Sequence, residues 1–288
     1  MATRMTLYLV DGTFEIFRCF HAADRYTADD GQKVGASRAF FHTIASLLRQ
    51  DDLTHIAIAF DSVVSRIERC DRSDSALLRS QFPIVSDIAR ALGITIWPMS
   101  RFQADDAIAT AASRYGKEED LDRIVICSND NDFAQCVVDS RIVRLNRINK
   151  ETWTEADVVS KFGVSPVQVP EYLALVGDPS DCIPGIPGFG PKSVASLISH
   201  FGRLEEVPTD GDLWPDSIRS KTKLATTLHE RRNEALLYRN LSILRIDVPL
   251  PDTLEDLTWL GARRRDVERV VQRLSSPDLL DRTIRYSN

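Results

Sequence analysis

Cysteine and long apolar runs are two features that this sequence has little of. Its five cysteines are odd in number and scattered, with no C-x-x-C pair, so we expect reduced thiols rather than a disulfide framework or a zinc site. No apolar run is long enough to span a bilayer, and no basic and then apolar leader follows Met1. These absences predict a cytoplasmic chain with no membrane partner.

Lysine is also rare, and acidic residues outnumber basic ones. Against 42 acidic residues stand 36 basic ones, only seven of them lysine, which gives a net charge of −6. This balance counts mildly against a nucleic-acid ligand, but bound divalent cations would invert the local field wherever acids gather. The 288 residues, 43% hydrophobic and 27% charged, are typical of a globular protein and suffice for a large core. Net charge therefore does not exclude a polyanionic substrate.

Strand-like and helix-like segments alternate through the first half of the chain. The predicted strands are 6–10, 55–60, 94–97, 123–127 and 141–145, and the main predicted helices between them are 36–50, 84–92 and 105–115. This alternation predicts an α/β fold with a mainly parallel sheet flanked by helices. After about residue 152 helical patterns dominate, at 155–162, 170–175, 193–201, 221–241 and 264–274. We therefore expect an α/β domain over 1–165 and a helical region over 166–288.

Three of the predicted strands lead directly into aspartates. Asp11, Asp61 and Asp130 follow the runs 6–10, 55–60 and 123–127. In an open parallel sheet the site lies outside the carboxyl ends of the strands, so the three carboxylates should meet at one edge. Like charges at one edge repel one another unless cations neutralise them. The pattern therefore predicts bound divalent metal, for which carboxylates are suitable ligands.

Two further clusters can add acids to the same edge. Gln103-Ala-Asp105-Asp106 falls on the first turn of a predicted helix, and Asp178 and Asp181 follow an apolar helical run with the same i,i+3 spacing. Asp130 and Asp132 would project to one face if the chain is extended there. Each pair also has a purely structural interpretation, as a helix cap or a turn. Their joint occurrence favours a metal site.

A glycine-rich segment, 185–195, joins two predicted helices. Glycine lets the backbone approach a ligand closely, and the following helix offers its N-terminal amides to an anion. Neither a dinucleotide-binding fingerprint nor a Walker A loop fits, because no strand precedes the segment and the glycine spacing is wrong. The segment is either a simple joint between helices or a hairpin whose amides and Lys192 bind a phosphate backbone without base contacts.

Taken in order, these motifs resemble one family. They are Leu9-Val-Asp-Gly12, Phe17-Arg-Cys-Phe-His-Ala22, Ala59-Phe-Asp61, Gln103-Ala-Asp-Asp106, Asp130-Asn-Asp132 and the long block from Val176 to Lys192. The chain resembles the 5′ nuclease family, that is, flap endonucleases and the 5′→3′ exonuclease domain of bacterial DNA polymerase I, over roughly residues 5–250. The resemblance implies a PIN-like nuclease body, a helix-hairpin-helix module at about 170–205, and a two-metal site that hydrolyses phosphodiesters near a 5′ end or a flap.

The resemblance also implies roles for individual residues. Catalytic residues would be Asp11, Asp61, Asp106, Asp130 and Arg66. Ligands of two Mg²⁺ or Mn²⁺ ions would be Asp11, Asp61, Gln103, Asp105, Asp106, Asp130, Asp132, Asp178 and Asp181, several of them through metal-bound water. DNA contacts would come from Arg18, Gly185, Gly188, Gly190, Lys192 and Ser193. In the family the hairpin also holds K⁺ between protein carbonyls and a DNA phosphate.

The chain departs from the family pattern at two places. Gln103 stands where the family has glutamate; its amide oxygen can ligate a metal but brings no negative charge. Between Asp61 and Phe102, where the family has an arch rich in lysine and aromatics, this chain has no lysine, and Arg66 matches a family arginine. Farther along, Arg263-Arg-Arg265 is either a solvated helix face or an extension of the DNA track.

We therefore expect a stand-alone, metal-dependent 5′→3′ exonuclease and flap endonuclease of DNA replication or repair. It would act alone or through partners because no polymerase-like domain follows. Its partners would be DNA 5′ ends, flaps or junctions, and we expect a monomer. Two alternatives stay open. One is a catalytically weak DNA-junction binder, motivated by Gln103 and the short arch, and the other is a PIN-type ribonuclease.

Overall fold

The computed structural model describes residues 4–23, 25–62, 75–280 and 285–287. The chain divides into two compact units, the first formed by 1–128 with 246–288 and the second by 129–245. The predicted domain limits, 1–165 and 166–288, concern sequence domains and stay a prediction. No helix among the described residues is both long and apolar enough to cross a membrane.

Unit 1 is built on four parallel strands in the order β3-β2-β1-β4. The strands are β1 (Thr6–Asp11), β2 (Leu53–Phe60), β3 (Thr95–Pro98) and β4 (Arg123–Cys127). The two central strands are almost wholly buried, since both faces of the sheet are covered, and this explains their unbroken apolar sequences. The predicted α/β class with a mainly parallel sheet is confirmed.

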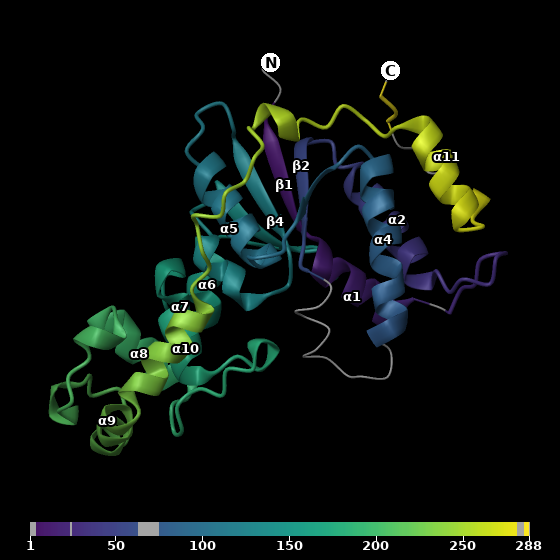
Figure 1. Ribbon diagram of the computed structural model, residues 1–288. Helices are drawn as coiled ribbons and strands as arrows, with labels where there is room; N and C mark the ends of the chain where they lie inside the picture. The colour runs from purple at the N-terminus through teal and green to yellow at the C-terminus, as the bar shows by residue number, and fades with distance from the viewer. Residues whose placement is uncertain (1–3, 24, 63–74, 281–284, 288) are drawn as a thin grey trace. The chain divides into compact units, whose positions relative to one another are not determined.

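The described α-helices of unit 1 are α1 (Gly12–Ala22), α2 (Gly35–Leu47), α4 (Ser75–Ala91), α5 (Ala104–Tyr115) and α11 (Arg264–Arg273). Figure 1 shows α5 on one side of the strands and α1, α2 and α4 on the other. The chain moves from β1 outward to β3 and then crosses to β4, so the strand order reverses between β1 and β4. Ligands of open α/β sheets bind at such a reversal.

The C-terminal segment packs onto unit 1. Trp97 Nε1 donates to Asp252 Oδ2 at 2.8 Å, and Trp259 Nε1 donates to the Leu92 carbonyl at 2.9 Å. Helix α11 lies alongside α4 and buries Val267 and Val271 (Figure 1). These contacts place α11 in the same unit as β1.

Unit 2 is mainly helical, with one antiparallel hairpin of strands. Its main elements are a 3-10 helix (Asn131–Cys136), β5 (Ile142–Asn146), β6 (Glu151–Trp153), α6 (Glu155–Phe162), α7 (Val169–Val176), α8 (Pro191–Phe201), α9 (Lys221–Glu230) and α10 (Arg232–Ser242). The single helix predicted over 221–241 is wrong: the chain bends at Arg231 (φ −112°, ψ 19°) and forms two helices. The bend lets both α9 and α10 pack apolar side chains into one core.

Candidate metal centre

Asp11 and Asp61 stand at the carboxyl ends of neighbouring strands of unit 1. Asp11 is fully buried; its Oδ1 accepts from the Phe14 N–H at 2.8 Å and its Oδ2 from the Ser128 hydroxyl at 3.0 Å. Asp61 is 7% exposed, and its Oδ1 accepts from the Ala104 N–H at 2.8 Å. Asp11 therefore ties β1 to the end of β4, and Asp61 ties β2 to the start of α5. This is the edge at which the sequence predicts metal-binding acids.

The first turn of α5 supplies two more carboxylates. Asp105 is buried, and Asp106 is half-buried with its Oδ2 accepting from the Gln103 N–H at 3.1 Å. Gln103 is the N-cap residue of α5, and its side chain is exposed. Asp106 thus stabilises the helix start, as the structural interpretation requires.

Unit 2 holds the other group of acids. Asp130, Asp132 and Asp181 each offer a carboxylate oxygen, and these three atoms lie within 4.8 Å of one another. The sequence argument for Asp130 and Asp132 requires an extended chain, but the chain turns here instead. Asp130 is the N-cap of the 3-10 helix, and its Oδ1 accepts from the Asp132 N–H at 3.1 Å. The tight turn, rather than strand alternation, brings the two carboxylates together. Asp178 lies nearby, with its Oδ2 3.4 Å from Asn131 Nδ2.

Electrostatics in this group favour a bound cation. Burial, reinforced by the charges of Asp130, Asp181 and Asp178, raises the pKa of Asp132 to about 9. Among the described residues, the buried Asp132 Oδ1 has no hydrogen-bond partner. A buried carboxylate oxygen facing other carboxylates is costly unless a proton or a metal ion joins it. The donors are all oxygens, the set preferred by Mg²⁺ and Mn²⁺, so these residues fit a divalent ion.

Arg144 on β5 is a buried cation that the sequence analysis did not single out. It is 2% exposed, its Nη1 donates to the Asp130 carbonyl at 2.9 Å, and its guanidinium lies 3.8 Å from the ring centre of Trp153. Burial lowers its pKa to about 10, although Asp130 and Glu151 favour its charge. Arg144 therefore fixes the backbone that carries Asp130. No sequence motif identifies it, because only the packing of β5 against the 3-10 helix that follows Asp130 brings Arg144 to the Asp130 carbonyl.

The glycine-rich segment forms a compact joint between α7 and α8. Asp178 and Ile183 exchange two backbone hydrogen bonds of 2.9 Å, and the Ile186 N–H donates to the Leu175 carbonyl at 2.8 Å. Gly190 is the N-cap of α8, and Lys192 and Ser193 follow on its first turn, Lys192 exposed. The acids 178 and 181 and the hairpin are thus parts of one continuous loop structure in unit 2.

Two predicted site residues need separate mention. Arg18 is held within unit 1, because its Nη2 lies 2.6 Å from the buried Glu15 carboxylate and 3.1 Å from Thr43 Oγ1. A DNA contact by Arg18 stays a prediction. Arg66 lies outside the described residues. Ser128 and Thr13 were missed; Thr13 Oγ1 accepts from the Asp61 N–H at 2.8 Å. Their positions directly after strand ends were the available signal.

Comparison with known families identifies the chain. A family model described as "5'-3' exonuclease, N-terminal resolvase-like domain" matches residues 6–163, and "5'-3' exonuclease, C-terminal SAM fold" matches residues 164–265. The chain belongs to the 5'-3' exonuclease family. The family predicted from the motifs is confirmed.

Curated relatives of the chain support its membership of the 5'-3' exonuclease family. A 5'-3' exonuclease of Aquifex aeolicus is 30% identical over 212 residues, covering 70% of this chain and 72% of that protein. DNA polymerase I of Mycobacterium bovis is 36% identical over 272 residues, covering 88% of this chain and 29% of that protein. The chain spans about a third or less of the DNA polymerase I relatives that it matches.

Solved structures share the fold of this family member. A T5 5'-exonuclease with bound zinc ions superposes with a TM-score of 0.64 at 19% identity, covering 96% of both chains. Human GEN1 in complex with Holliday junction DNA gives a TM-score of 0.64 at 13% identity, covering 93% of this chain and 67% of that one. At these identities the likeness shows the fold alone, α/β with a helical part.

Proposed function

We propose that this chain is a divalent-metal-dependent 5′→3′ exonuclease and flap endonuclease acting on DNA 5′ ends, flaps and junctions. The observation that carries the proposal is the group Asp130, Asp132 and Asp181, each of which has a carboxylate oxygen within 4.8 Å of the others. Within the described part of the chain, the buried Asp132 Oδ1 has no hydrogen-bond partner. The family membership supports the reaction class. The DNA and metals named for the solved relatives support the substrate and the cofactor.

The proposed ligands of two Mg²⁺ or Mn²⁺ ions are Asp11, Asp61, Gln103, Asp105, Asp106, Asp130, Asp132, Asp178 and Asp181. Such ions would activate water at neutral pH and would stabilise the negative charge of an in-line displacement at phosphorus. The protein's own part is positional. The hydrogen bonds from Phe14, Ser128 and Ala104 fix the carboxylates of Asp11 and Asp61 at the sheet edge. Arg144 fixes the main chain at Asp130.

The hairpin between α7 and α8 is the proposed DNA grip. Gly185, Gly188, Gly190, Lys192 and Ser193 would present amides and one cation to a phosphate backbone, with K⁺ held at the same loop. Phosphate contacts carry no sequence information, so cleavage should depend on DNA structure and on salt more than on base sequence. The monomeric state, the cytoplasmic location and the roles of Arg18 and Arg66 stay predictions.

The test is single-turnover cleavage of a 5′-flap DNA while Mn²⁺ is titrated. We expect Asp11→Asn and Asp130→Asn to lose at least roughly a hundredfold in rate, because each removes one charge from the metal ligands and changes little in volume. Asp51→Asn and Asp139→Asn, which neutralise exposed aspartates in the same two units, are the matched controls. Normal cleavage by Asp11→Asn or Asp130→Asn would contradict the site.

The same experiment separates the alternatives. Saturable binding of the flap by the wild-type protein with no product at any Mn²⁺ concentration would favour the junction binder. Cleavage of an RNA flap in preference to the DNA flap would favour the ribonuclease. The exposed Gln103 at the start of α5 is the feature that makes the first alternative worth testing.

A further inference from the structure

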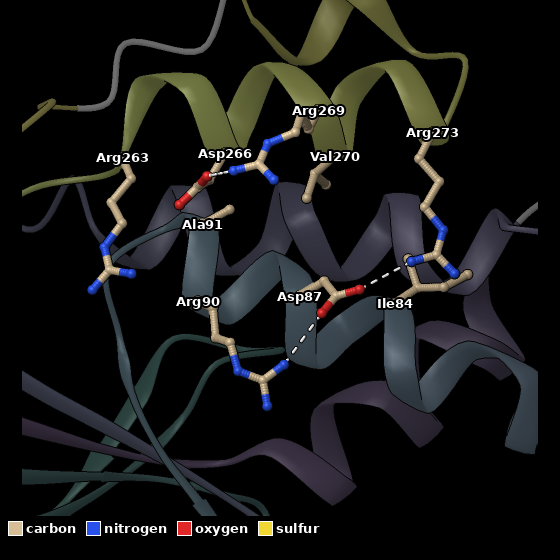
Figure 2. A pocket seen from close by; sticks show the side chains of 9 residues that line it. All are labelled: Ile84, Asp87, Arg90, Ala91, Arg263, Asp266, Arg269, Val270 and Arg273. Atoms are coloured by element: carbon tan, nitrogen blue, oxygen red, sulfur yellow. Dashed lines mark hydrogen bonds and ion pairs between the residues drawn. The ribbon is translucent and has the colours of Figure 1, made fainter.

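A groove between α4 and α11 of unit 1 gathers four arginines. Arg90 comes from α4, and Arg263, Arg269 and Arg273 come from the segment of α11. The groove encloses about 380 Å³, and its floor is apolar, made of the buried side chains of Ile84, Ala91 and Val270. Figure 2 shows the guanidinium groups spread from one end of the groove to the other. None of these residues belongs to the candidate metal centre.

The charges in the groove do not cancel. Its two acids are Asp87 and Asp266, so four arginines leave two net positive charges. Asp87 is shared, with its Oδ1 3.2 Å from Arg90 and its Oδ2 3.0 Å from Arg273. Asp266 pairs with Arg269 (Figure 2). All four arginines are exposed, and each guanidinium has five N–H donors, so donors remain for an added anion.

The groove is fixed in place by the packing of the two helices. The Arg263 N–H donates to the Ala91 carbonyl at 2.8 Å, which ties the start of α11 to the end of α4. Val267, Val270 and Val271 are buried on the inner side of α11. An added ligand would therefore meet arginines whose backbones are already ordered, which lowers the entropic cost of binding.

The layout of the arginines favours an elongated polyanion over a small one. The ten-residue helix α11 is about 15 Å long, and Arg263 and Arg273 stand at its two ends. A single anion would touch one end only, whereas successive phosphates of a nucleic-acid strand, spaced by about 3.4 Å along the axis, can span both. Guanidinium groups bind phosphate oxygens bidentately. Arg264 and Arg265, both exposed, extend the positive charge at the helix start.

We propose that this groove is a second DNA-binding surface, which takes the phosphate backbone of the substrate strand independently of the hairpin between α7 and α8. The proposal rests on the proposed function, since it assigns the groove to the same DNA. It also gives Arg263-Arg-Arg265 a role on the DNA track rather than that of a solvated face.

The test is equilibrium binding of fluorescent single-stranded and 5′-flap DNA in EDTA, measured by anisotropy as a function of salt. For R263Q/R273Q we expect the slope of log K against log salt to fall by about 1.4 to 1.8, with affinity at 0.1 M salt weaker by roughly tenfold or more. The control R4Q/R49Q removes two exposed arginines of unit 1 outside the groove and should change neither quantity.

A second variant gives a gain that misfolding cannot imitate. Asp87→Asn removes a half-exposed acid and releases Arg90 and Arg273, so DNA binding should strengthen by roughly three- to tenfold. Poly-glutamate is the probe for an acidic protein partner. If R263Q/R273Q loses poly-glutamate binding but binds DNA as the wild type does, the proposal is overturned in favour of such a partner. The proposal would also be overturned if R263Q/R273Q bound DNA with the same affinity and salt dependence as the control R4Q/R49Q.

Cleavage of the flap by wild-type protein in Mn²⁺ separates this proposal from the proposed function. If the wild-type protein cleaves the flap and R263Q/R273Q binds DNA as the wild type does, only the groove proposal is refuted. If the wild-type protein neither cleaves nor binds the flap DNA, both the proposed function and the groove proposal are refuted.

Discussion

At the scale of single residues, Gln103 is the feature that most affects the proposed chemistry. It begins α5, its side chain is exposed, and the next two acids of the helix stand beside it. An amide oxygen can take the same position as a carboxylate oxygen but contributes no charge to a cation. The affinity of an oxygen-ligand site depends on the number of charged ligands, so this position should limit metal affinity.

If Gln103 is a ligand as proposed, Gln103→Glu should lower the Mn²⁺ concentration for half-maximal flap cleavage by roughly three- to tenfold, because it would add one more carboxylate to the proposed metal site. Activity against metal concentration measures it. Gln50→Glu adds the same charge at an exposed position of unit 1 and serves as the control. An unchanged metal dependence in Gln103→Glu would show that this side chain does not ligate metal.

At the scale of elements, the joint between α7 and α8 depends on backbone that only glycine accommodates easily. Gly185 has φ +73°, and a Cβ there would lie 2.6 Å from the Val176 carbonyl carbon. Gly190, at the start of α8, has φ −106°, and a Cβ there would meet no atom within 4 Å. Position 185 therefore requires glycine, whereas position 190 has room for a side chain.

Gly185→Ala should lower the free energy of unfolding by about 2 kcal/mol or more, through the positive φ and the backbone clash. Gly190→Ala should change it by less than about 1 kcal/mol. Urea unfolding followed by circular dichroism measures both. Equal effects of the two substitutions would mean that the joint is not as tightly packed as the close approach of Gly185 to Val176 indicates.

At the scale of the whole molecule, the buried acids link stability to pH and to metal. The pKa of Asp132 is raised from its ordinary value of 3.8 to about 9 in the folded protein. Between these two pH values the folded protein therefore holds a proton on Asp132 that the unfolded chain has released. The stabilisation from this proton is complete below pH 3.8 and is lost as the pH rises toward 9. A divalent ion that binds only the folded state would replace the proton and restore stability.

In EDTA the melting temperature should fall between pH 7 and pH 9, and Mg²⁺ should raise it again. Asp132→Asn has no proton to lose, so its melting temperature should fall less over this range and respond less to Mg²⁺. Differential scanning calorimetry with Asp139→Asn as the control measures both effects. An identical pH slope in the wild type and Asp132→Asn would contradict the raised pKa of Asp132.

Much of the fold and part of the site were predictable from the sequence because the signals are local. Apolar runs ending in aspartate gave β1, β2 and β4, and the acids at their ends follow from chain continuity. The break between α9 and α10 was not predictable, because both segments have helical periodicity and the bend at Arg231 serves packing in a core built from distant residues.

The sequence by itself determined the family, the α/β class and the identity of the acids, since these depend on residue types at fixed spacing. Only the tertiary structure decided which of them share a local environment. It gathered Asp130, Asp132 and Asp181, placed Arg144 against the Asp130 carbonyl, and aligned α11 with α4 to form the arginine groove. Asp181 is far in the chain from the other two aspartates, and α11 is far from α4, so these contacts depend on burial and charge that no local pattern encodes.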